Sequence, residues 1–408
     1  MPRPWTAITP CGFDNDVVVI QTPPSFPFVA SDKNVRVSFA TATDADGIEI
    51  RGDGIACAAK GTTGIRMKPY RISMSAPAKQ ADAVIERRQN AWVRLRPRES
   101  SARTPGFWFR AMRAISFPLS VFPILIGTSC ALLSGPVDWV LFGLALIGGV
   151  AAHAGTNLFS DYSDFVKGVD TTNALSSHTG VLVDELVEPA RILLAAAACG
   201  LVTAFVGGIL AVVVGWPILI FGIGGLLGGF FYTGGPRAFK YLGRGEASAG
   251  FLMGPLMVCG AYFVQARTLS VPIILLSIAV GLLVSTVSLA NNIRDAFFDR
   301  EAGITTMPVR LGPQNARVLF RIIIALPYLL VGCAVWFDIR LSPALAVVLS
   351  APWAIRAALR LGRGACGDLT ALSERAARSM LPLQVIQLHT KFCFLLLVGC
   401  AAGYFFFR

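Results

Sequence analysis

The sequence predicts an all-α, polytopic membrane protein with nine membrane-crossing helices. Three observations indicate this class. The mean hydropathy is +0.62, and 54% of the 408 residues are hydrophobic whereas 15% are charged. Long uncharged runs recur, and the longest can each cross about 30 Å of hydrocarbon as one helix. Basic residues fall in alternate connections between the runs. Ordinary soluble domains have a different composition.

The predicted crossings follow in order along the chain. Single uncharged runs predict four of them, at residues 117–137, 139–160, 247–266 and 268–293. Residues 192–236 carry no charge and are long enough for two crossings joined by a turn at Gly215-Trp216-Pro217. Three shorter runs have basic flanks that can snorkel to the interface, at residues 322–337, 341–355 and 392–407.

The basic residues orient these helices. Most fall on the same predicted side as the basic N-terminal arm: Lys167, Arg237, Lys240, Arg244, Arg294, Arg300, Arg310, Arg317, Arg360, Arg363, Arg375 and Arg378. The opposite side has only Arg267, Arg340 and Arg408. The positive-inside rule therefore predicts a cell (inner) membrane protein with a cytoplasmic N-terminus and an external C-terminus. The net charge of +12 reflects this topology, and no basic and aromatic patch indicates a nucleic-acid partner.

Residues 1–105 differ from residues 106–408, which form the predicted membrane domain. The N-terminal segment has scattered Pro, Gly, Asp and Arg, with neither a membrane-length apolar run nor a clear period. We expect an extension that is disordered or weakly structured, with Met67 and Met74 as candidate downstream starts. The nine cysteines show no metal-binding spacing and are expected to be apolar filler. Of the three histidines, His153 and His389 are given no role, and His178 lies in the loop after the first acidic motif.

Two acid-rich segments lie at the ends of apolar runs, where carboxylates are costly unless a cation binds them. In the first, Asn157, Asp161 and Asp164 are spaced four and three apart, so they form one stripe at the cytoplasmic end of the second helix. The second segment repeats this pattern at the end of the sixth helix, with Asn291, Asp295 and Asp299. Acids and bases at helix ends often form solvated salt bridges of little consequence. Two matched stripes favour a binding site instead.

A divalent cation would relieve the repulsion among four carboxylates in a low-dielectric bundle. Ligands that are all oxygen, without Cys or His, point to Mg²⁺, which shares its shell with substrate phosphates. The expected metal ligands are Asp161, Asp164, Asp295 and Asp299. Basic and polar neighbours are expected to neutralise or reach a bound diphosphate: Lys167, Arg294, Arg300, Tyr232 and Lys240.

Three segments carry a family resemblance: Asp161-Tyr-Ser-Asp164-Phe-Val-Lys167-Gly-Val-Asp170; Asn291-Asn292-Ile-Arg294-Asp295-Ala-Phe-Phe-Asp299-Arg300-Glu-Ala-Gly303; and Tyr232-Thr-Gly-Gly-Pro-Arg237 with Gly243-Arg-Gly-Glu246. From about residue 110 onward, the chain resembles the UbiA superfamily of intramembrane aromatic prenyltransferases. Within it, the motifs are similar to those of the dihydroxynaphthoate prenyltransferase (MenA) branch. Two positions depart from the usual motifs of that branch, Ser160 and Ile304. Neither departure removes a carboxylate, but Ile304 is similar to animal homologues and leaves prenyl length and exact acceptor open.

The resemblance implies a nine-helix UbiA-type bundle around a central cavity. It implies transfer of a polyprenyl group from polyprenyl diphosphate to 1,4-dihydroxy-2-naphthoate, with decarboxylation, in menaquinone biosynthesis. The four aspartates would hold two Mg²⁺ ions, and Lys167 would help to stabilise the departing diphosphate. The remaining implied substrate- and cofactor-binding residues are Asn157, Asp170, Tyr232, Lys240, Asn291, Asn292, Arg294 and Arg300. The prenyl tail would follow the glycine-rich face Gly222, Gly224, Gly225, Gly228 and Gly229.

Two alternatives remain open at this stage. The acceptor can be another aromatic or a lipid alcohol, since the aspartates report only on the diphosphate half of the reaction. A cation-coupled transporter also places acids within a membrane, but such transporters bind their ions near the midplane between inverted repeats. In this sequence the acids lie at helix ends on one side, which disfavours a transporter.

Overall fold

The computed structural model describes residues 9–14, 17–21, 37–38, 41–42, 48–59, 62–74, 83–88, 91–95, 105–169, 181–182, 186–301, 303–361 and 380–407. The chain divides into two units, Met1–Phe107 with Glu185–Val187, and Trp108–Asp184 with Glu188–Arg408. Each unit has its own secondary structure, strands in the first and helices in the second. The nine predicted crossings therefore all lie in the second unit.

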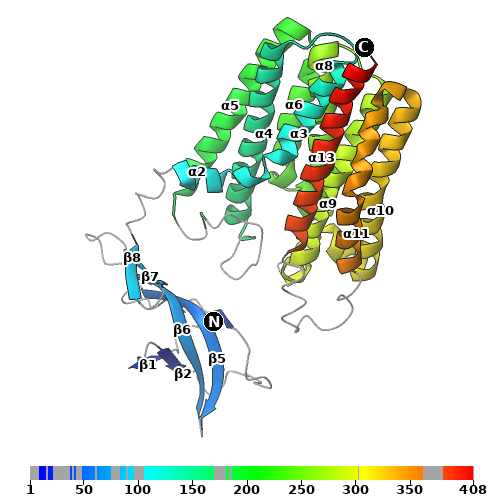
Figure 1. Ribbon diagram of the computed structural model, residues 1–408. Helices are drawn as coiled ribbons and strands as arrows, with labels where there is room; N and C mark the ends of the chain where they lie inside the picture. Colours follow the sequence, from blue (N-terminus) through cyan, green and yellow to red (C-terminus); the bar gives the residue numbers. More distant parts are fainter. Residues whose placement is uncertain are drawn as a thin grey trace. The chain divides into compact units, whose positions relative to one another are not determined.

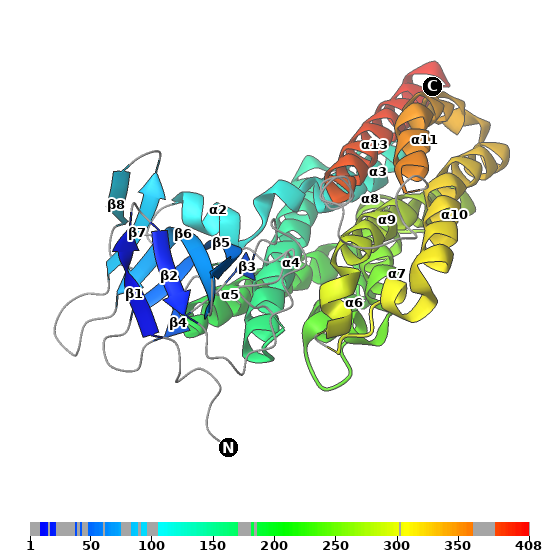
Figure 2. The ribbon, with the colours of Figure 1, turned by 90° about the horizontal axis from the view of Figure 1, so that it is seen from below.

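The first unit contains eight strands in one antiparallel sheet (Figure 2). The strands are β1 (Thr9–Asp14), β2 (Val17–Gln21), β3 (Val37–Ser38), β4 (Thr41–Ala42), β5 (Ile48–Ala59), β6 (Thr62–Met74), β7 (Ala83–Arg88) and β8 (Ala91–Leu95). Their order is β1-β2-β6-β5-β3, with β4 on β5, and β7 between β6 and β8. The sequence pattern predicts a disordered or weakly structured segment here, and this stays a prediction. Sheet pairing depends on cross-strand neighbours, which a local period does not reveal. An N-terminal extension with its own role remains a proposal.

The second unit is a helical bundle whose long helices run side by side (Figure 1). Its elements are α2 (Pro105–Ala111), η1 (Ala114–Ser116), α3 (Pro118–Ala131), α4 (Trp139–Val166), α5 (Pro189–Val214), α6 (Ile218–Thr233), η2 (Phe239–Leu242), α7 (Gly245–Phe251), η3 (Leu252–Leu256), α8 (Met257–Ala266), α9 (Val271–Glu301), α10 (Met307–Phe337), η4 (Ile339–Ser350), α11 (Ala351–Arg360) and α13 (Leu381–Phe406). The prediction of an all-helical membrane bundle is confirmed for this unit.

Nine apolar helical segments match the nine predicted crossings in order. Within the described residues, eight are long and apolar enough to cross a membrane, and Ile218–Thr233 is a shorter ninth. The predicted ends were less accurate than the segments. The last helix begins at Leu381 instead of residue 392, because Lys391 lies over the Trp353 ring at 3.6 Å and is accommodated inside the helix. α10 spans Met307–Phe337 but is interrupted at Gly312, where φ is 75° and ψ is 165°. Its part after this kink therefore begins several residues before the predicted residue 322.

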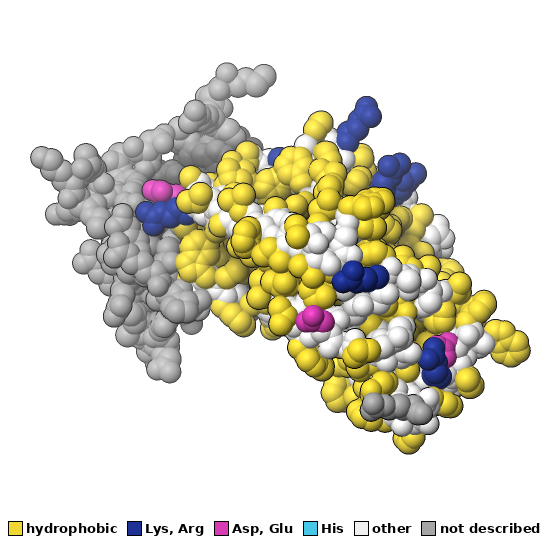
Figure 3. Space-filling model, turned by 90° about the horizontal axis from the view of Figure 1, so that it is seen from above, with side chains coloured by type: hydrophobic (Ala, Val, Ile, Leu, Met, Phe, Trp, Pro, Cys, Tyr) yellow, Lys and Arg dark blue, Asp and Glu magenta, His cyan; other side chains and the backbone are white. Residues whose placement is uncertain are grey.

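The surface of this unit suits a lipid environment. Hydrophobic side chains dominate the described part of the face in Figure 3, and charged side chains are few on it. Large apolar residues such as Phe205, Val212 and Trp336 are mostly exposed. In water such a surface would drive aggregation, whereas hydrocarbon solvates it at no cost. The apolar core instead gathers around α9, which packs on α10, α7 and α13.

Close glycine packing fixes the short helix α7 and the π-helical turn η3 against α9. A Cβ atom on Gly254 would lie 2.4 Å from Cα of Gly281, and a Cβ on Gly250 would lie 2.7 Å from the carbonyl oxygen of Gly281. Both contacts are shorter than side chains tolerate, so these positions require glycine. The Ser285 hydroxyl also donates to the Glu246 carbonyl at 2.9 Å. Residues that α7 carries are therefore held rigidly beside the acidic end of α9.

Candidate active site

The first acidic stripe lies on α4 and faces the protein interior. Asp138 caps this helix by accepting hydrogen bonds from the backbone N–H groups of Val140 and Leu141. At its other end, Asp161 is 3% exposed and Asp164 is 1% exposed. Buried carboxylates must be paired or hydrogen-bonded, so their partners define the site.

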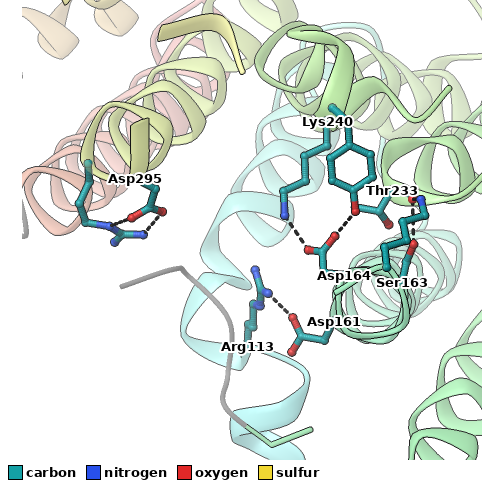
Figure 4. Close-up of polar contacts among 10 residues, drawn as sticks. Arg113, Asp161, Ser163, Asp164, Thr233, Lys240 and Asp295 are labelled. Atoms are coloured by element: carbon teal, nitrogen blue, oxygen red, sulfur yellow. Dashed lines mark hydrogen bonds and ion pairs between the residues drawn. The ribbon is translucent and has the colours of Figure 1, made fainter. Parts of the chain in front are cut away.

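Both carboxylates are paired with basic side chains from distant elements. Arg113 donates from Nη2 to Asp161 Oδ1, and Lys240 donates from Nζ to Asp164 Oδ2 at 2.6 Å. Tyr241 donates its hydroxyl to the other oxygen of Asp164. Figure 4 shows Arg113 and Lys240 pointing toward the two aspartates of α4. The first motif is thus electrically balanced by groups that are not part of it.

Arg113 reaches this position through an unusual backbone turn. It lies between α2 and η1 with φ 54° and ψ 45°, in the left-handed region. That conformation costs a residue other than glycine roughly 1–2 kcal/mol. The ion pair with Asp161 offsets part of this cost and holds the turn at the edge of the site. Strained residues that persist in this way are common at functional sites.

Lys167 follows the last turn of α4 and binds backbone oxygens. Its Nζ donates to the Thr233 carbonyl and to the Gly235 carbonyl at 3.2 Å, and it lies 4.7 Å from the centre of the Tyr241 ring. Burial lowers the pKa of Lys167, the nearby Asp164 carboxylate opposes this effect, and the positive charge of Lys240 adds to it. Lys167 therefore ties α4 to the connection that follows α6.

The second stripe lies on α9 and has closer partners. Arg294 donates two hydrogen bonds, both 2.7 Å long, to the carboxylate of its neighbour Asp295. Asp299 accepts a hydrogen bond of 3.1 Å from the Thr306 hydroxyl. Burial raises the pKa of Asp299 to about 6, and the negative charges of Asp295 and Glu246 add to the rise. The Thr306 bond and the positive charge of Lys240 act in the opposite direction.

A further carboxylate adjoins the second motif from α7. Glu246 is 5% exposed and accepts a hydrogen bond of 2.8 Å from Asn292 Nδ2. Within the described part of the chain, its second oxygen has no hydrogen-bond partner. Since a carboxylate only accepts, the amide nitrogen of Asn292 must face Glu246. The second motif therefore contacts a further carboxylate that neither stripe predicted.

One large cavity adjoins both motifs. Its volume is about 650 Å³, and its lining includes five of the predicted site residues: Asn157, Tyr232, Lys240, Asn291 and Asn292. Arg113 lies at the same polar end, and Gly222 and Gly225 of α6 line the apolar part. The four aspartates do not line the cavity themselves. Arg113 and Lys240, the basic partners of Asp161 and Asp164, do line it.

The donor set suits a hard divalent cation in its chemistry. Buried carboxylate and amide oxygens from two helices are the ligands that Mg²⁺ prefers. In this structure, basic side chains occupy oxygens of Asp161, Asp164 and Asp295. Among the described residues, no three acids, histidines or cysteines lie close enough to hold one ion together. Figure 4 likewise shows Asp295 apart from Asp161 and Asp164.

Some site residues were predicted and others were missed. Arg300 is exposed on the last turns of α9, and both Asp170 and His178 lie outside the described residues. Glu246 of α7 ends one of the segments that carried the resemblance, and that segment was the available signal for it. Tyr241 of η2 lies between the two quoted parts, Tyr232–Arg237 and Gly243–Glu246. Arg113 had no such signal, because it lies 48 residues from its partner in no recognisable motif.

Comparison with known proteins identifies related chains. Residues 120–369 match the model of the UbiA prenyltransferase family. The chain is 30% identical over 295 residues to 1,4-dihydroxy-2-naphthoate octaprenyltransferase of Bacillus subtilis, covering 70% of this chain and 89% of that protein. It is 34% identical over 225 residues to the enzyme of the same name from Escherichia coli, covering 52% and 70%. It is also 34% identical to UbiA prenyltransferase domain-containing protein 1 of Xenopus tropicalis, covering 54% and 64%.

Two solved structures have a similar fold. One is a digeranylgeranylglyceryl phosphate synthase, with a TM-score of 0.52, 14% identity, and coverage of 75% of this chain and 99% of that chain. The other is a UbiA homologue from Archaeoglobus fulgidus bound to DMAPP and Mg²⁺, with a TM-score of 0.50, 15% identity, and coverage of 70% and 99%. At these identities the likeness is one of fold alone.

Proposed function

The chain belongs to the UbiA prenyltransferase family, and we propose that it transfers a polyprenyl group from polyprenyl diphosphate to 1,4-dihydroxy-2-naphthoate in menaquinone biosynthesis. It is an integral membrane prenyltransferase of the UbiA type. Two relatives that carry the dihydroxynaphthoate name support this acceptor. The motif Lys167-Gly-Val-Asp170, which resembles that branch, supports it as well.

The single observation that carries the proposal is the shared cavity. One pocket of about 650 Å³ is lined by Asn157 of the first motif and by Asn291 and Asn292 of the second. Its remaining wall is largely apolar, which suits a prenyl chain and excludes water from a reactive allylic cation. Had the acids of the two motifs faced bulk solvent without a common cavity, this function would have had no physical basis.

Magnesium is proposed as the cofactor, with two ions. Asp161, Asp164, Asp295 and Asp299 would hold them, and Asn157 and Asn291 would support the carboxylates. The A. fulgidus homologue bound to DMAPP and Mg²⁺ supports this choice. Magnesium held by these residues would supply positive charge to the departing diphosphate. Removal of divalent cations with a chelator should abolish turnover, and added Mg²⁺ should restore it. Full turnover in chelator would contradict the proposed cofactor.

The basic residues of this chain bind and orient the diphosphate. Lys240 and Arg113 are at the polar end of the cavity, where their donors suit phosphate oxygens. Arg294, Arg300 and Lys167 do not line the cavity, and their proposed role is to add positive charge to the region that binds the diphosphate. The carbon–oxygen bond of the prenyl diphosphate breaks, and its electron pair leaves with diphosphate. A ring carbon of the acceptor then forms the new carbon–carbon bond, and the acceptor carboxylate leaves as carbon dioxide.

Substitution of the motif aspartates tests this assignment. Asp161→Ala and Asp295→Ala should each abolish prenyl transfer while the protein still inserts into membranes. Glu188→Ala is a matched control, because this carboxylate is largely exposed and pairs only loosely with Arg191 at 3.6 Å. Turnover at the wild-type rate in either aspartate variant would count against the proposed site. Supplying candidate aromatic and lipid acceptors with one labelled polyprenyl diphosphate would identify the acceptor.

We also propose that the acidic ends of α4 and α9 face the cytoplasm, in the cell (inner) membrane. Lys167 follows α4, Arg237 follows α6, and Arg300 lies in the last turn of α9. By contrast, Arg267 follows α8 and Arg340 lies in the first turn of η4, at the opposite ends of the helices. Membrane-impermeant thiol labelling of single cysteines placed at residues 244 and 267 would test the orientation. Labelling of residue 244 from outside intact cells would reverse it.

A further inference from the structure

A polar cluster lies on the cavity wall at a place that the proposed mechanism does not use. His153 of α4 and Ser116 of η1 both line the cavity, and Ser120 of α3 contacts the same imidazole. His153 is 4% exposed and lies four residues before Asn157 on the same helix. Side chains with this spacing are neighbours, with Cβ atoms about 5–6 Å apart. The cluster is therefore one helical turn from the polar end of the cavity.

The hydroxyl of Ser120 determines which nitrogen of His153 carries the proton. Ser120 Oγ donates to the Phe117 carbonyl at 3.0 Å, and it lies 3.0 Å from His153 Nδ1. A hydroxyl has one proton, and that of Ser120 is used for the carbonyl. Nδ1 must therefore donate to Ser120, so a neutral imidazole has its lone pair on Nε2.

The lone pair on Nε2 has no good donor among the described residues. Nε2 lies 3.4 Å from Ser116 Oγ, but Ser116 donates its own proton to the Arg113 carbonyl at 2.7 Å. Asn157 Nδ2 approaches the same oxygen at 3.4 Å as a further donor. Ser116 Oγ therefore presents lone pairs to Nε2. A buried acceptor without a donor costs about 1–3 kcal/mol, which a ligand hydroxyl in the cavity would recover.

We propose that His153 Nε2 accepts a hydrogen bond from a ring hydroxyl of the aromatic substrate that receives the prenyl group. His153 is then a binding residue for that substrate. This inference rests on the proposed function. It places the aromatic substrate beside His153 in the cavity. A planar ring suits that place, because the Phe117 ring already packs against the imidazole with centroids 5.7 Å apart. The nearby Asn157 then puts the acceptor ring beside the diphosphate end, where a new carbon–carbon bond can form.

The test compares His153→Phe with the wild type on matched acceptors, 1,4-dihydroxy-2-naphthoate and its two monomethyl ethers. In the wild type, methylation of the recognised hydroxyl should raise the KM for the acceptor about tenfold, the cost of one hydrogen bond in a water-poor site. His153→Phe should raise the KM for the dihydroxy acceptor by a similar factor. In that variant, methylation of the same hydroxyl should have no further effect. The KM for polyprenyl diphosphate should stay unchanged.

A matched control separates recognition from structure. His389 of α13 is also fully buried, but it contacts Cys393 and does not line the cavity. His389→Phe should leave the KM for the acceptor at the wild-type value. If His153→Phe does not fold, Ser120→Ala provides the second variant. Without Ser120, the imidazole can place its proton on Nε2, so the KM for the acceptor should rise while the KM for the diphosphate does not.

Several outcomes would overturn the inference. Additive effects of methylation and His153→Phe, parallel rises in both KM values, or an equal effect of His389→Phe would each show a structural role. An unchanged KM for the acceptor in both His153→Phe and Ser120→Ala would also overturn the inference, but it would leave the proposed function intact. If the wild-type protein prenylates no dihydroxylated aromatic, the proposed function fails and this inference fails with it.

Discussion

The acidic ends of α4 and α9 each carry one asparagine and two aspartates at helical spacing, but their charges are balanced in different ways. On α4, Asp161 and Asp164 pair with Arg113 and Lys240, which are 48 and 76 residues away. On α9, Asp295 pairs with the adjacent Arg294, and Asp299 accepts from Thr306, seven residues later. The first motif therefore depends on tertiary packing for its charge balance, and the second depends mainly on local sequence. Similar stripes can thus respond differently to the same kind of substitution.

The largest expected difference is in folding stability. Asp164→Ala would leave Lys240 and Tyr241 without their shared carboxylate, whereas Asp295→Ala would leave only the adjacent Arg294. We expect Asp164→Ala to lower the free energy of unfolding by about 2–3 kcal/mol, because it breaks a buried pair. Asp295→Ala should lower it by about 1 kcal/mol. Thermal unfolding in detergent would measure both, and equal losses would remove the contrast between the two ends.

The next effect concerns Lys240, which links the two motifs. It pairs with Asp164, lowers the pKa of Asp299 through its charge, and lines the cavity. Lys240→Met should raise the KM for polyprenyl diphosphate about tenfold, the cost of one charge-assisted hydrogen bond. Arg294→Met should raise it less, because Arg294 does not line the cavity. Steady-state kinetics at varied concentrations of polyprenyl diphosphate would measure both KM values. A larger rise in Arg294→Met than in Lys240→Met would show that Arg294, and not Lys240, binds the diphosphate.

A smaller effect is expected at the left-handed turn of Arg113. Arg113 and Arg267 are the positive-φ residues other than glycine in the described chain, with φ 54° and 56°. Arg267→Gly should leave turnover unchanged. Glycine adopts the left-handed conformation without strain, and this relief offsets the loss of the hydrogen bond from Arg267 to the Val213 carbonyl. Arg113→Gly relieves the same backbone strain but should lower turnover about fivefold, because Asp161 loses a charged partner. Equal turnover in the two glycine variants would show that the Arg113 pair is dispensable.

The smallest effect is expected at Lys167. Because its Nζ binds the carbonyls of Thr233 and Gly235, Lys167→Ala should loosen the connection after α6 and lower stability by about 1 kcal/mol. The KM for the diphosphate should rise about threefold, less than for Lys240→Met, because the structure places Lys167 on backbone oxygens. A tenfold rise with unchanged stability would instead place Lys167 directly on the substrate.

Much of the architecture was predictable from sequence, because the hydropathy patterns that identify membrane-crossing helices are local. The uncharged runs predicted the nine apolar helical segments of the second unit, and the spacing of Asn157, Asp161 and Asp164 predicted a common helical face. Helix ends were harder to predict, as Lys391 shows. Its charge suggested a boundary, but the Trp353 ring on another helix accommodates it. Strand pairing in the first unit is likewise not a local property, since it joins segments such as β2 and β6 that are far apart in the chain.

The sequence by itself determined that this chain crosses the membrane repeatedly and carries two acidic stripes at helix ends, because hydropathy and the helical period act over a few neighbouring residues. Only the tertiary structure decided that Arg113 and Lys240 reach the aspartates of α4, that Glu246 accepts a hydrogen bond from Asn292, and that His153 lines the cavity. These contacts depend on how separate helices pack and on where a strained turn points. No local pattern specifies them, since each joins residues that lie on different elements.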